Sequence, residues 1–540
     1  MPMSNRRAAV ESLESRRLFT AYYLDSTVGV GSDANAGTDP LQPWASIARI
    51  NAGALKPGDA VYLRAGDAFA GNLVLSANDA GTASSPVVFD TYTPGQDASG
   101  ATTIAIGSAT ATLNAGNGTG IAASNTAGFS INDLNIVGAG QAANSYSGVQ
   151  FDNNLAGNMQ LAAVHLNNLT ISGFGKYGIT IGGSNGKSGF SNVSITNCFV
   201  HDNVVGGIET HGVFSAKATT YANSNVYLGY DTVYNNQGYA GSSSHVGDGI
   251  VLSDVNGGTI EHCTAYNNGT LNTHVGGPVG IWAWDSNALT IQSNVSHDNH
   301  THSTADGGGF DLDGGCTNCI LQYNYSYNND GAGYGLFQFS GARAWNNNTV
   351  RFNVSENDAR KNSYGAITLY NGGSGINSAQ IYQNTIYLTS AAGATASGID
   401  VQTAVSNVAV RNNIIQTTGG ALLVDIEAKV SSLLFQGNDY WSSGAAFQIK
   451  QMTKTYASLS AWQKGTGEEQ LNGTAIGLNV NPQFADPASP GTRTATAYRL
   501  AVNSPLLGAG LNLTSLFGIV PGSQNFLGDS TANVWNIGAD

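Results

Sequence analysis

The sequence of 540 residues is rich in glycine and poor in charge, with 70 Gly, only 10% charged residues and a net charge of −14 at pH 7. Hydrophobic residues make up 41% of the chain, which is enough for a core and excludes a disordered protein. The negative charge argues against nucleic acid or an anionic membrane as a partner, and the absence of an apolar run of about 20 residues predicts no membrane span.

The first 21 residues differ from the rest and are set apart from the fold. They are basic and lack the complete apolar stretch of a signal peptide. Residues 13–19, Leu-Glu-Ser-Arg-Arg-Leu-Phe, resemble a short opening found on many exported bacterial proteins. This resemblance implies a secreted or cell-surface bacterial protein; the alternative is a terminus that carries no address.

The stretch from residue 22 to about residue 125 is expected to cap one end of the fold. It begins with a strand and a Gly/Asp/Asn loop, followed by a helix over Pro43–Leu55. This helix places four apolar side chains on one side, where they can close an exposed end: Trp44, Ile47, Ile50 and Leu55. Further strands are predicted at Val87–Tyr92, Thr103–Ile106 and near Ile131–Val137.

Between about residues 126 and 438 a unit of roughly 30 residues repeats. One position of the unit recurs at steps of 29 to 33 residues. A period this regular predicts a solenoid of about eleven coils, in which the recurring side chains stack at the spacing of neighbouring strands, about 4.8 Å. The recurring residues are Cys198, Asp231, Cys263, Asn294, Asn324, Asn353, Asn384 and Asn413.

A second phrase in the repeat, Gly-apolar-x-apolar-x, alternates with period two and therefore predicts a strand. Its apolar residues should face the core and its x residues should face outward. The phrase occurs at Gly207–His211, Gly249–Ser253, Gly280–Trp284, Gly309–Asp313, Gly335–Phe339 and Gly398–Gln402.

Together the two patterns resemble the right-handed parallel β-helix of the pectin-lyase-like superfamily, over roughly Tyr22–Phe484. The resemblance implies one all-β solenoid domain with a helix/strand cap at the N-terminal end and a C-terminal cap, followed by an extended cap segment over residues 485–540. It also implies a substrate groove on the outer face of the first sheet, which the Gly phrases form. Because this fold hosts lyases, hydrolases, epimerases and adhesins, the reaction stays open.

Three consecutive Gly phrases present chemistry suited to a sugar. Asp311 and Asp313 lie between aromatic pairs, and their Cβ atoms should be about 6.5–7 Å apart on one strand. Carboxyl pairs flank a glycosidic bond that is hydrolysed, and aromatic rings stack on sugar faces. We therefore predict Asp311 and Asp313 as the catalytic pair; alternatively, the aromatics pack under loops and Asp313 begins a simple turn. The predicted substrate-binding aromatics are Trp282, Trp284, Phe337 and Phe339.

Other polar residues of the outward positions and long loops are further candidates. Glu209 and His211 would extend the groove, and Arg343 would bind substrate. The metal content is not predicted, since two His residues without a third ligand are thin grounds for a site. The weak metal-ligand candidates are Asp248, Asp306, His300 and His302.

The cap and the site also resemble family 9 polysaccharide lyases, whose phrase Gly-Asn-Gly-Phe-Lys-Leu-Gly-Gly supplies a Lys base. Here the phrase reads Gly307-Gly-Gly-Phe-Asp311-Leu-Asp313-Gly-Gly315, with Asp311 at the place of the Lys. A lyase would need another base, such as Arg343, Arg360, Lys361 or a loop His, and calcium to offset an acidic groove.

The first hypothesis is therefore a monomeric hydrolase of a polysaccharide that needs no cofactor. A calcium-assisted lyase on an acidic polysaccharide such as pectate is the second, and a non-catalytic carbohydrate-binding or surface solenoid is the third. Cys198 and Cys263, two coils apart, are predicted as buried thiols, because a disulfide cannot span that distance. Cys316 and Cys319 form either a local disulfide or a free pair.

Overall fold

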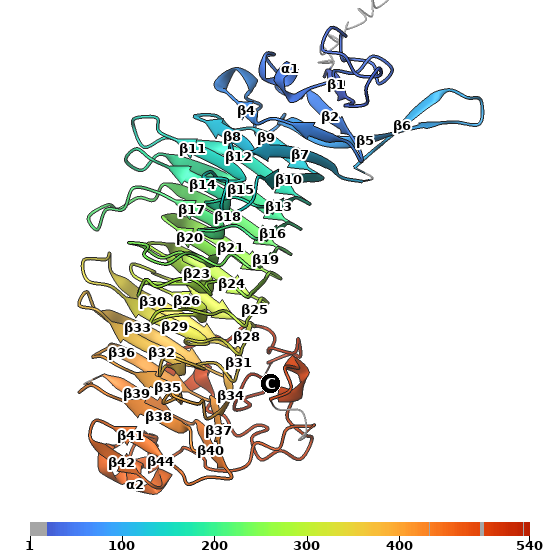
Figure 1. The fold of residues 1–540 in the computed structure, drawn as a ribbon. Coiled ribbons are helices and arrows are strands. Elements are labelled where there is room, and N and C mark those ends of the chain that lie inside the picture. The colour runs from blue at the N-terminus through green and yellow to red at the C-terminus, as the bar shows by residue number, and fades with distance from the viewer. Residues whose placement is uncertain (1–18, 108, 431, 487–490, 533) are drawn as a thin grey trace, which may run out of the picture.

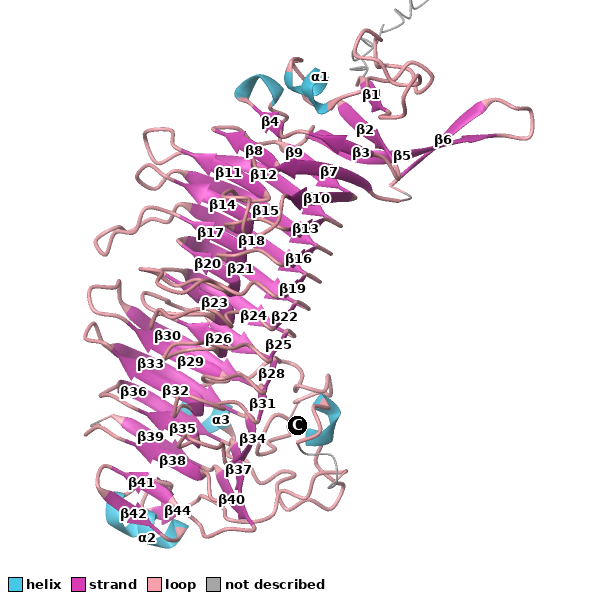
Figure 2. Ribbon diagram, in the orientation of Figure 1, coloured by secondary structure: helices cyan, strands magenta, loops and turns pink. Residues whose placement is uncertain are grey.

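The computed structural model describes residues 19–107, 109–430, 432–486, 491–532 and 534–540. Most of the predicted N-terminal segment, up to residue 18, lies outside these ranges. Three long sheets of parallel strands run side by side along an elongated body (Figure 1, Figure 2), with 14, 15 and 13 strands within the described ranges. The chain is a parallel β-helix, as predicted. None of the helices in these ranges has the length and apolar character needed to cross a membrane.

The first sheet contains the Gly-apolar-x-apolar-x strands. Its strands pair in parallel, except that the last two pair antiparallel. In order they are β4 (Leu73–Leu75), β8 (Ile121–Ser124), β11 (Val149–Asn153), β14 (Tyr177–Gly183), β17 (Gly206–His211), β20 (Asp248–Ser253), β23 (Val279–Trp284), β26 (Gly308–Leu312), β29 (Tyr334–Gln338), β32 (Gly365–Asn371), β35 (Ser397–Val401), β38 (Leu422–Ile426), β41 (Ile449–Gln451) and β42 (Lys454–Tyr456).

The second sheet leads each coil up to the turn with the recurring Asn. Its strands are β1 (Ala21–Leu24), β2 (Ala60–Arg64), β5 (Val87–Gln96), β9 (Phe129–Asn132), β12 (Gln160–Asn167), β15 (Gly189–Thr196), β18 (Asn223–Gly229), β21 (Val255–Glu261), β24 (Asn287–Gln292), β27 (Ile320–Gln322), β30 (Trp345–Arg351), β33 (Ile376–Tyr382), β36 (Ser406–Arg411) and β39 (Leu433–Gln436), with β6 (Thr102–Ile106) antiparallel to β5.

The third sheet follows that turn. Its strands are β3 (Ala68–Ala70), β7 (Ala111–Gly116), β10 (Leu134–Gly138), β13 (Thr170–Ser172), β16 (Phe199–His201), β19 (Thr232–Tyr234), β22 (Thr264–Tyr266), β25 (Val295–His297), β28 (Tyr325–Tyr327), β31 (Val354–Glu356), β34 (Thr385–Thr389), β37 (Ile414–Thr418) and β40 (Asp439–Ser443).

The recurring Asn side chains stack on one another, as predicted. The backbone N and Nδ2 of Asn294 both donate to Oδ1 of Asn324 at 3.0 Å, and Asn324 donates in the same way to Asn353 at 2.9 and 3.1 Å. These residues and their successors form a ladder of amides that joins coil to coil inside the turn. The ladder continues through Asn384, Asn413 and Asn438 to the carboxylate of Glu469.

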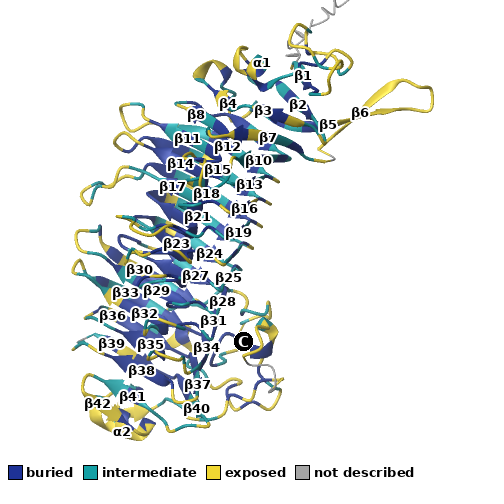
Figure 3. Ribbon diagram, viewed as in Figure 1, coloured by how far each residue is buried: buried dark blue, intermediate teal, exposed yellow. Residues whose placement is uncertain are grey.

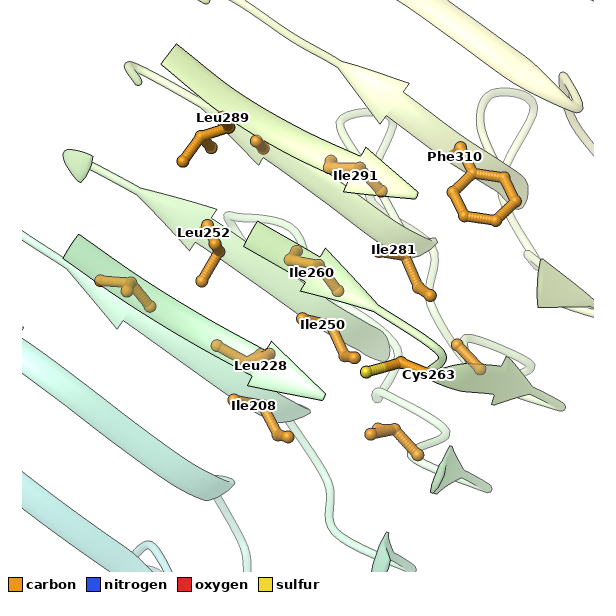
Figure 4. Packing of buried hydrophobic residues seen from close by; sticks show 14 of the residues in the cluster. Ile208, Leu228, Ile250, Leu252, Ile260, Cys263, Ile281, Leu289, Ile291 and Phe310 are labelled. Carbon is orange, nitrogen blue, oxygen red and sulfur yellow. The ribbon is translucent and has the colours of Figure 1, made fainter. Parts of the chain in front are cut away.

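Buried residues run along all three sheets (Figure 3), and their apolar side chains form one core cluster. Ile208, Ile250, Ile281 and Phe310 hold equivalent positions on successive strands of the first sheet and are at most 1% exposed. Figure 4 shows them stacked along the axis, opposite residues such as Ile260 of the second sheet. The apolar positions of the Gly phrase therefore face inward, as predicted, and a rigid scaffold carries the opposite face.

Both ends of the solenoid are covered. The predicted helix over Pro43–Leu55 is shorter than expected, since α1 spans Ile47–Asn51, but its four apolar residues are buried as predicted. At the other end lie α2 (Leu459–Thr466) and the short hairpin of β43 (Gln470–Leu471) and β44 (Thr474–Ala475) (Figure 2).

The C-terminal segment, predicted as an extended cap, lies along the side of the solenoid next to β28–β34 (Figure 1). Tyr498 contacts Tyr387 of β34, with ring centroids 6.2 Å apart, and Leu513 packs with Phe352 and Tyr382. The segment contains α3 (Leu513–Phe517) and a 3-10 turn at Ala495–Tyr498. Another 3-10 turn lies at Ala77–Asp79.

Candidate active site

A cavity of about 410 Å³ opens on the outer side of the first sheet, at β26, β29 and β32. Loops that precede β23, β26 and β32 form its walls, and strand residues form its floor. Its lining includes two carboxyl groups and four aromatic rings. The lining residues are Val275, Gly276, Ala305, Asp306, Asp313, Phe337, Gln338, Phe339, Tyr364, Tyr370 and Gln402.

Asp306 and Asp313 are the carboxyl groups that line this cavity. Asp306 ends the loop before β26, and Asp313 follows β26 directly, so one strand fixes both. Burial raises the pKa of Asp313 to about 6, although the hydrogen bond from the N–H of Gly314 and the positive charge of His245 both lower it. Burial and then the charge of Asp313 raise the pKa of Asp306 to about 7. Two carboxyl groups whose pKa values differ and lie near neutrality suit proton transfer.

Asp311 lies deeper than predicted. The outward direction of its side chain is as expected, but neighbouring loops cover it, and it is 3% exposed and does not line the cavity. Its Oδ1 has no hydrogen-bond partner. Burial, followed by the charges of Asp313 and Asp306, raises the pKa of Asp311 well above its ordinary value. Its predicted catalytic role stays a prediction, since Asp313 and Asp306 hold the accessible positions.

The register after Asp311 differs from the predicted alignment. Asp311 pairs with Gly335, and Leu312 with Leu336, so Phe337 rather than Phe339 lies beside Asp313 in the following strand. Gly333, not Gly335, is the equivalent of Gly309: a Cβ at either position would meet a Ser and an Asn or Asp of the next turn. The structure nevertheless brings Phe337 and Phe339 into the cavity.

The two predicted Trp residues contact other side chains of the protein. Trp282 is 3% exposed, and its Nε1 donates to Oδ1 of Asp248 at 3.0 Å. Trp284 packs against Phe214 and Phe339, with ring centroids 5.7 and 6.1 Å away. Neither lines the cavity; Trp282 is buried and Trp284 is half-buried, so their role as substrate-binding residues stays a prediction.

Glu209 and His211 lie three strands away from Asp313, which corresponds to about 14 Å at the usual strand spacing. Oγ1 of Thr180 donates to Oε2 of Glu209 at 3.0 Å and is 3.1 Å from Nδ1 of His211. The pair is half-buried on the outer face but separate from the cavity.

Arg343 is 8% exposed and is engaged by other groups of the protein, so its role in substrate binding stays a prediction. Its Nε donates to Asp285, and its Nη2 donates to Oδ1 of Asp254 at 3.2 Å. Its guanidinium lies 4.1 Å from the ring centroid of Tyr221, and its Nη1 donates to backbone carbonyls of the loop before β18. Arg343 therefore fastens this loop.

The other basic residues considered for a lyase are also engaged. Nη2 of Arg360 donates to the carbonyls of Asp358 and Thr389, both at 2.8 Å, and Lys361 donates to the carbonyl of Thr301. Among the described residues, no Lys or Arg lines the cavity.

The metal-ligand candidates do not converge. Within the described ranges, no three His, Cys, Asp or Glu residues are grouped closely enough to hold a metal ion. His300 is hydrogen bonded to Asp330, Asp248 binds His245, Asp306 lines the cavity, and His302 is exposed. Cys198 and Cys263 are buried free thiols, as predicted. Cys316 and Cys319, for which a disulfide and a free pair were both considered, are also free and buried.

Sequence reasoning missed Tyr364, Tyr370 and Gln402, and it gave Asp306 only a weak metal role. A signal for Tyr370 was present, because Ile367-Thr-Leu-Tyr370 alternates like the other strands and β32 pairs in register with β29. The coil has Ala366 where the others have Gly, so the Gly phrase did not detect it.

Comparison with known proteins completes the description of the site. No family model matches the chain. A lacto-N-biosidase of Bifidobacterium longum subsp. longum is 24% identical over 463 residues, covering 68% of this chain and 27% of that protein. The chain thus spans about a quarter of the length of this relative. Among solved structures, a GH136 lacto-N-biosidase from Eubacterium ramulus has a TM-score of 0.49, with 19% identity over 71% of this chain and 67% of the other. Pectate lyase Pel9A has a TM-score of 0.42, with 13% identity over 97% of both chains.

Proposed function

We propose that this protein is a glycoside hydrolase in which Asp306 and Asp313 cleave the glycosidic bond of a neutral glycan. The observation that carries the proposal is the presence of both carboxyl groups on the wall of one cavity that also contains aromatic rings. Hydrolysis of a glycosidic bond needs two carboxyl groups on either side of it. The sequence match to a lacto-N-biosidase supports the same reaction class.

The two carboxyl groups have different environments and therefore different roles. Asp306, with a pKa of about 7, keeps its proton near neutral pH and serves as the general acid. Asp313, with a pKa of about 6, is mostly ionised there and serves as the base or nucleophile on the opposite side of the bond. Between pH 6 and 7 both groups are in the form that the reaction needs, so activity should peak in this window.

The charge of the cavity favours a neutral substrate. Asp306 and Asp313 line it, and in the described part of the chain neither Lys nor Arg does. A uronate polymer would bring further negative charge to this site, where no Lys or Arg among the described lining residues offsets it. The basic candidates Arg343, Arg360 and Lys361 are held by other groups, which argues against a lyase at this place.

The cavity lies on one side of the carboxyl groups. Its strand residues come from β29 and β32, and Gln402 follows β35, whereas Trp282 and Asp248 of the preceding strands are buried and do not line it. A cavity of about 410 Å³ is at the small end for ligand sites. We therefore infer that the enzyme removes a short terminal fragment from a glycan chain.

The proposal is tested with an aryl lacto-N-bioside, a set of neutral oligosaccharides and pectate. Reducing ends from a neutral substrate, without products that absorb as unsaturated uronates, support it. Asp306→Asn and Asp313→Asn should each lower kcat by at least about 10²-fold through lost proton transfer. Unsaturated products from pectate, or full activity of both variants on the neutral substrate, would reject it.

A further inference from the structure

His245 lies in the loop between β19 and β20 and is fixed at the edge of the carboxyl cluster. Its Nδ1 donates to Oδ2 of Asp248 at 2.7 Å. Oδ1 of Asp248 in turn accepts from the backbone N of Val279 at 3.1 Å and from Nε1 of Trp282 at 3.0 Å. The indole ring of Trp282 stands nearly perpendicular to the imidazole, with centroids 5.1 Å apart. Two neighbouring strands, β20 and β23, therefore hold this one side chain in place.

The charged groups that act on His245 are all carboxyl groups. A Cβ at Gly277 would lie 2.6 Å from Cβ of His245, and the neighbouring Gly276 lines the cavity together with Asp306 and Asp313. The negative charges of Asp248, Glu209 and Asp313 act on the imidazole. Burial opposes the positive charge, but these carboxylates outweigh it and raise the pKa of His245 to about 9. The imidazole is thus a cation at neutral pH, in a region where Arg343 and Lys361 are directed to other partners.

Asp313 needs such a cation to stay ionised. The titratable groups that face it are Asp306, Asp311, Cys316 and His245. Three carboxyl groups in a poorly hydrated site compete for protons, because each charge disfavours the next. Of the four neighbours, His245 alone can carry a positive charge.

We propose that His245 is a positioning residue that Asp248 holds as a cation beside Asp313, so that Asp313 stays anionic while Asp306 keeps its proton. The inference rests on the proposed function for its reaction but on the hydrogen bonds above for its geometry. His245 is the link between the buried Trp282–Asp248 pair and the reacting carboxylate.

The first test is the pH dependence of kcat/KM. His245→Gln can still donate to Asp248 but carries no charge. Asp248→Asn places an amide N–H against Nδ1 and so favours the neutral imidazole, while its Oδ1 can still accept from Trp282. Both variants should shift the acid limb to higher pH and lower kcat/KM at pH 6 about tenfold, because fewer molecules have Asp313 ionised.

His300→Gln is the matched control, since His300 also binds a loop carboxylate, Asp330, but does not face Asp313. Its acid limb should coincide with that of the wild type. An equal loss of activity at all pH values in His245→Gln and Asp248→Asn would assign them a structural role and overturn the proposal.

The second test does not depend on activity. The chain has nine His residues, and their Cε1–H signals can be titrated by NMR, with His245→Gln assigning the signal. His245 should titrate near pH 9 in the wild type and at lower pH in Asp313→Asn, where the facing anion is lost. An unchanged His245 titration in Asp313→Asn overturns the coupling, even if the enzyme proves inactive on every glycan; a shift there supports it independently of the proposed reaction.

Discussion

Two rows of buried polar side chains run from coil to coil in this protein, and they are satisfied to very different degrees. In the amide ladder, Asn324 accepts two hydrogen bonds and donates two, to Asn353 and to the carbonyl of Ile291. On the first sheet, the row that starts at Asp311 contains three carboxyl groups, with Gly335 and Thr368 between Asp311 and Asp400. Asp311, Asp400 and Asp425 each have one buried oxygen with no hydrogen-bond partner.

The difference follows from the chemistry of the two groups. An amide is both donor and acceptor, so identical copies can stack without limit and without charge. An ionised carboxylate only accepts, so stacked copies repel, and burial raises the pKa of Asp400 to about 7. The first row stabilises the solenoid, whereas the second buries carboxyl groups at a cost in stability, and one of them, Asp311, adjoins the site through Asp313 and Asp306.

The most direct test of this difference between amides and carboxylates is to put a carboxylate into the ladder. Asn324→Asp would direct an oxygen at two acceptors, Oδ1 of Asn353 and the carbonyl of Ile291, which now accept from Nδ2 at 3.1 and 2.8 Å. We expect a loss of about 3 kcal/mol or more in the free energy of unfolding at pH 7, because a buried charge is left unpaired. Urea unfolding monitored by circular dichroism measures it.

Asn347→Asp is the matched control, since Asn347 is an exposed Asn of β30 in another stack, where its Nδ2 donates to Asn318 at 2.8 Å. Its stability should change by no more than about 0.5 kcal/mol. Equal losses in the two variants would show that burial of the ladder does not matter.

The ladder and the fold could be read from the sequence, but only part of the site could. The period and the alternation each reflect one contact that every coil repeats, so they placed Asn294 and the inward face of β26 correctly. The alignment failed at Gly335 because the coil after β26 is shorter. Phe310 stacks on Tyr334, with centroids 5.3 Å apart, and this contact sets the register rather than the Gly.

The second feature that the sequence could not predict is which outward side chains the loops cover. The outward direction of Trp282 and Asp311 follows from alternation, but their burial depends on loops that differ from coil to coil and carry no period. For the same reason Asp306, which lies in such a loop, could not be placed beside Asp313 from sequence. A repeat predicts only the contacts that recur in every coil, and the candidate catalytic residues do not recur.

The second prediction concerns the cost of the acidic row. The pKa of Asp311 is raised in the folded protein, so its contribution to stability is present below its ordinary pKa of 3.8 and is lost as pH rises. Asp311→Asn cannot ionise, so it should match the wild type near pH 4 and be more stable at pH 8. One pKa unit corresponds to about 1.4 kcal/mol, and we expect a gain on the order of that size.

Melting temperatures at both pH values test this, together with kcat of the same variant. A gain in stability with little loss of kcat would assign the catalysis to Asp306 and Asp313. A loss of kcat of about 10²-fold would support the catalytic role first predicted for Asp311. No difference in pH dependence between variant and wild type would contradict the burial of an ionisable group here.

The smallest expected effect separates aromatic residues that bind substrate from those that support the fold. Tyr370 lines the cavity and is 43% exposed, so Tyr370→Ala should raise KM about fivefold, equivalent to about 1 kcal/mol of lost stacking, with little change in melting temperature. Trp282→Ala should instead lower the melting temperature, because it removes a buried ring and a hydrogen-bond partner of Asp248. Tyr146, 50% exposed and outside the cavity lining, provides the control, since Tyr146→Ala should change neither quantity. If Tyr370→Ala leaves KM unchanged while Trp282→Ala raises it at unchanged stability, the substrate lies over β23, and the one-sided cavity is not where the glycan binds.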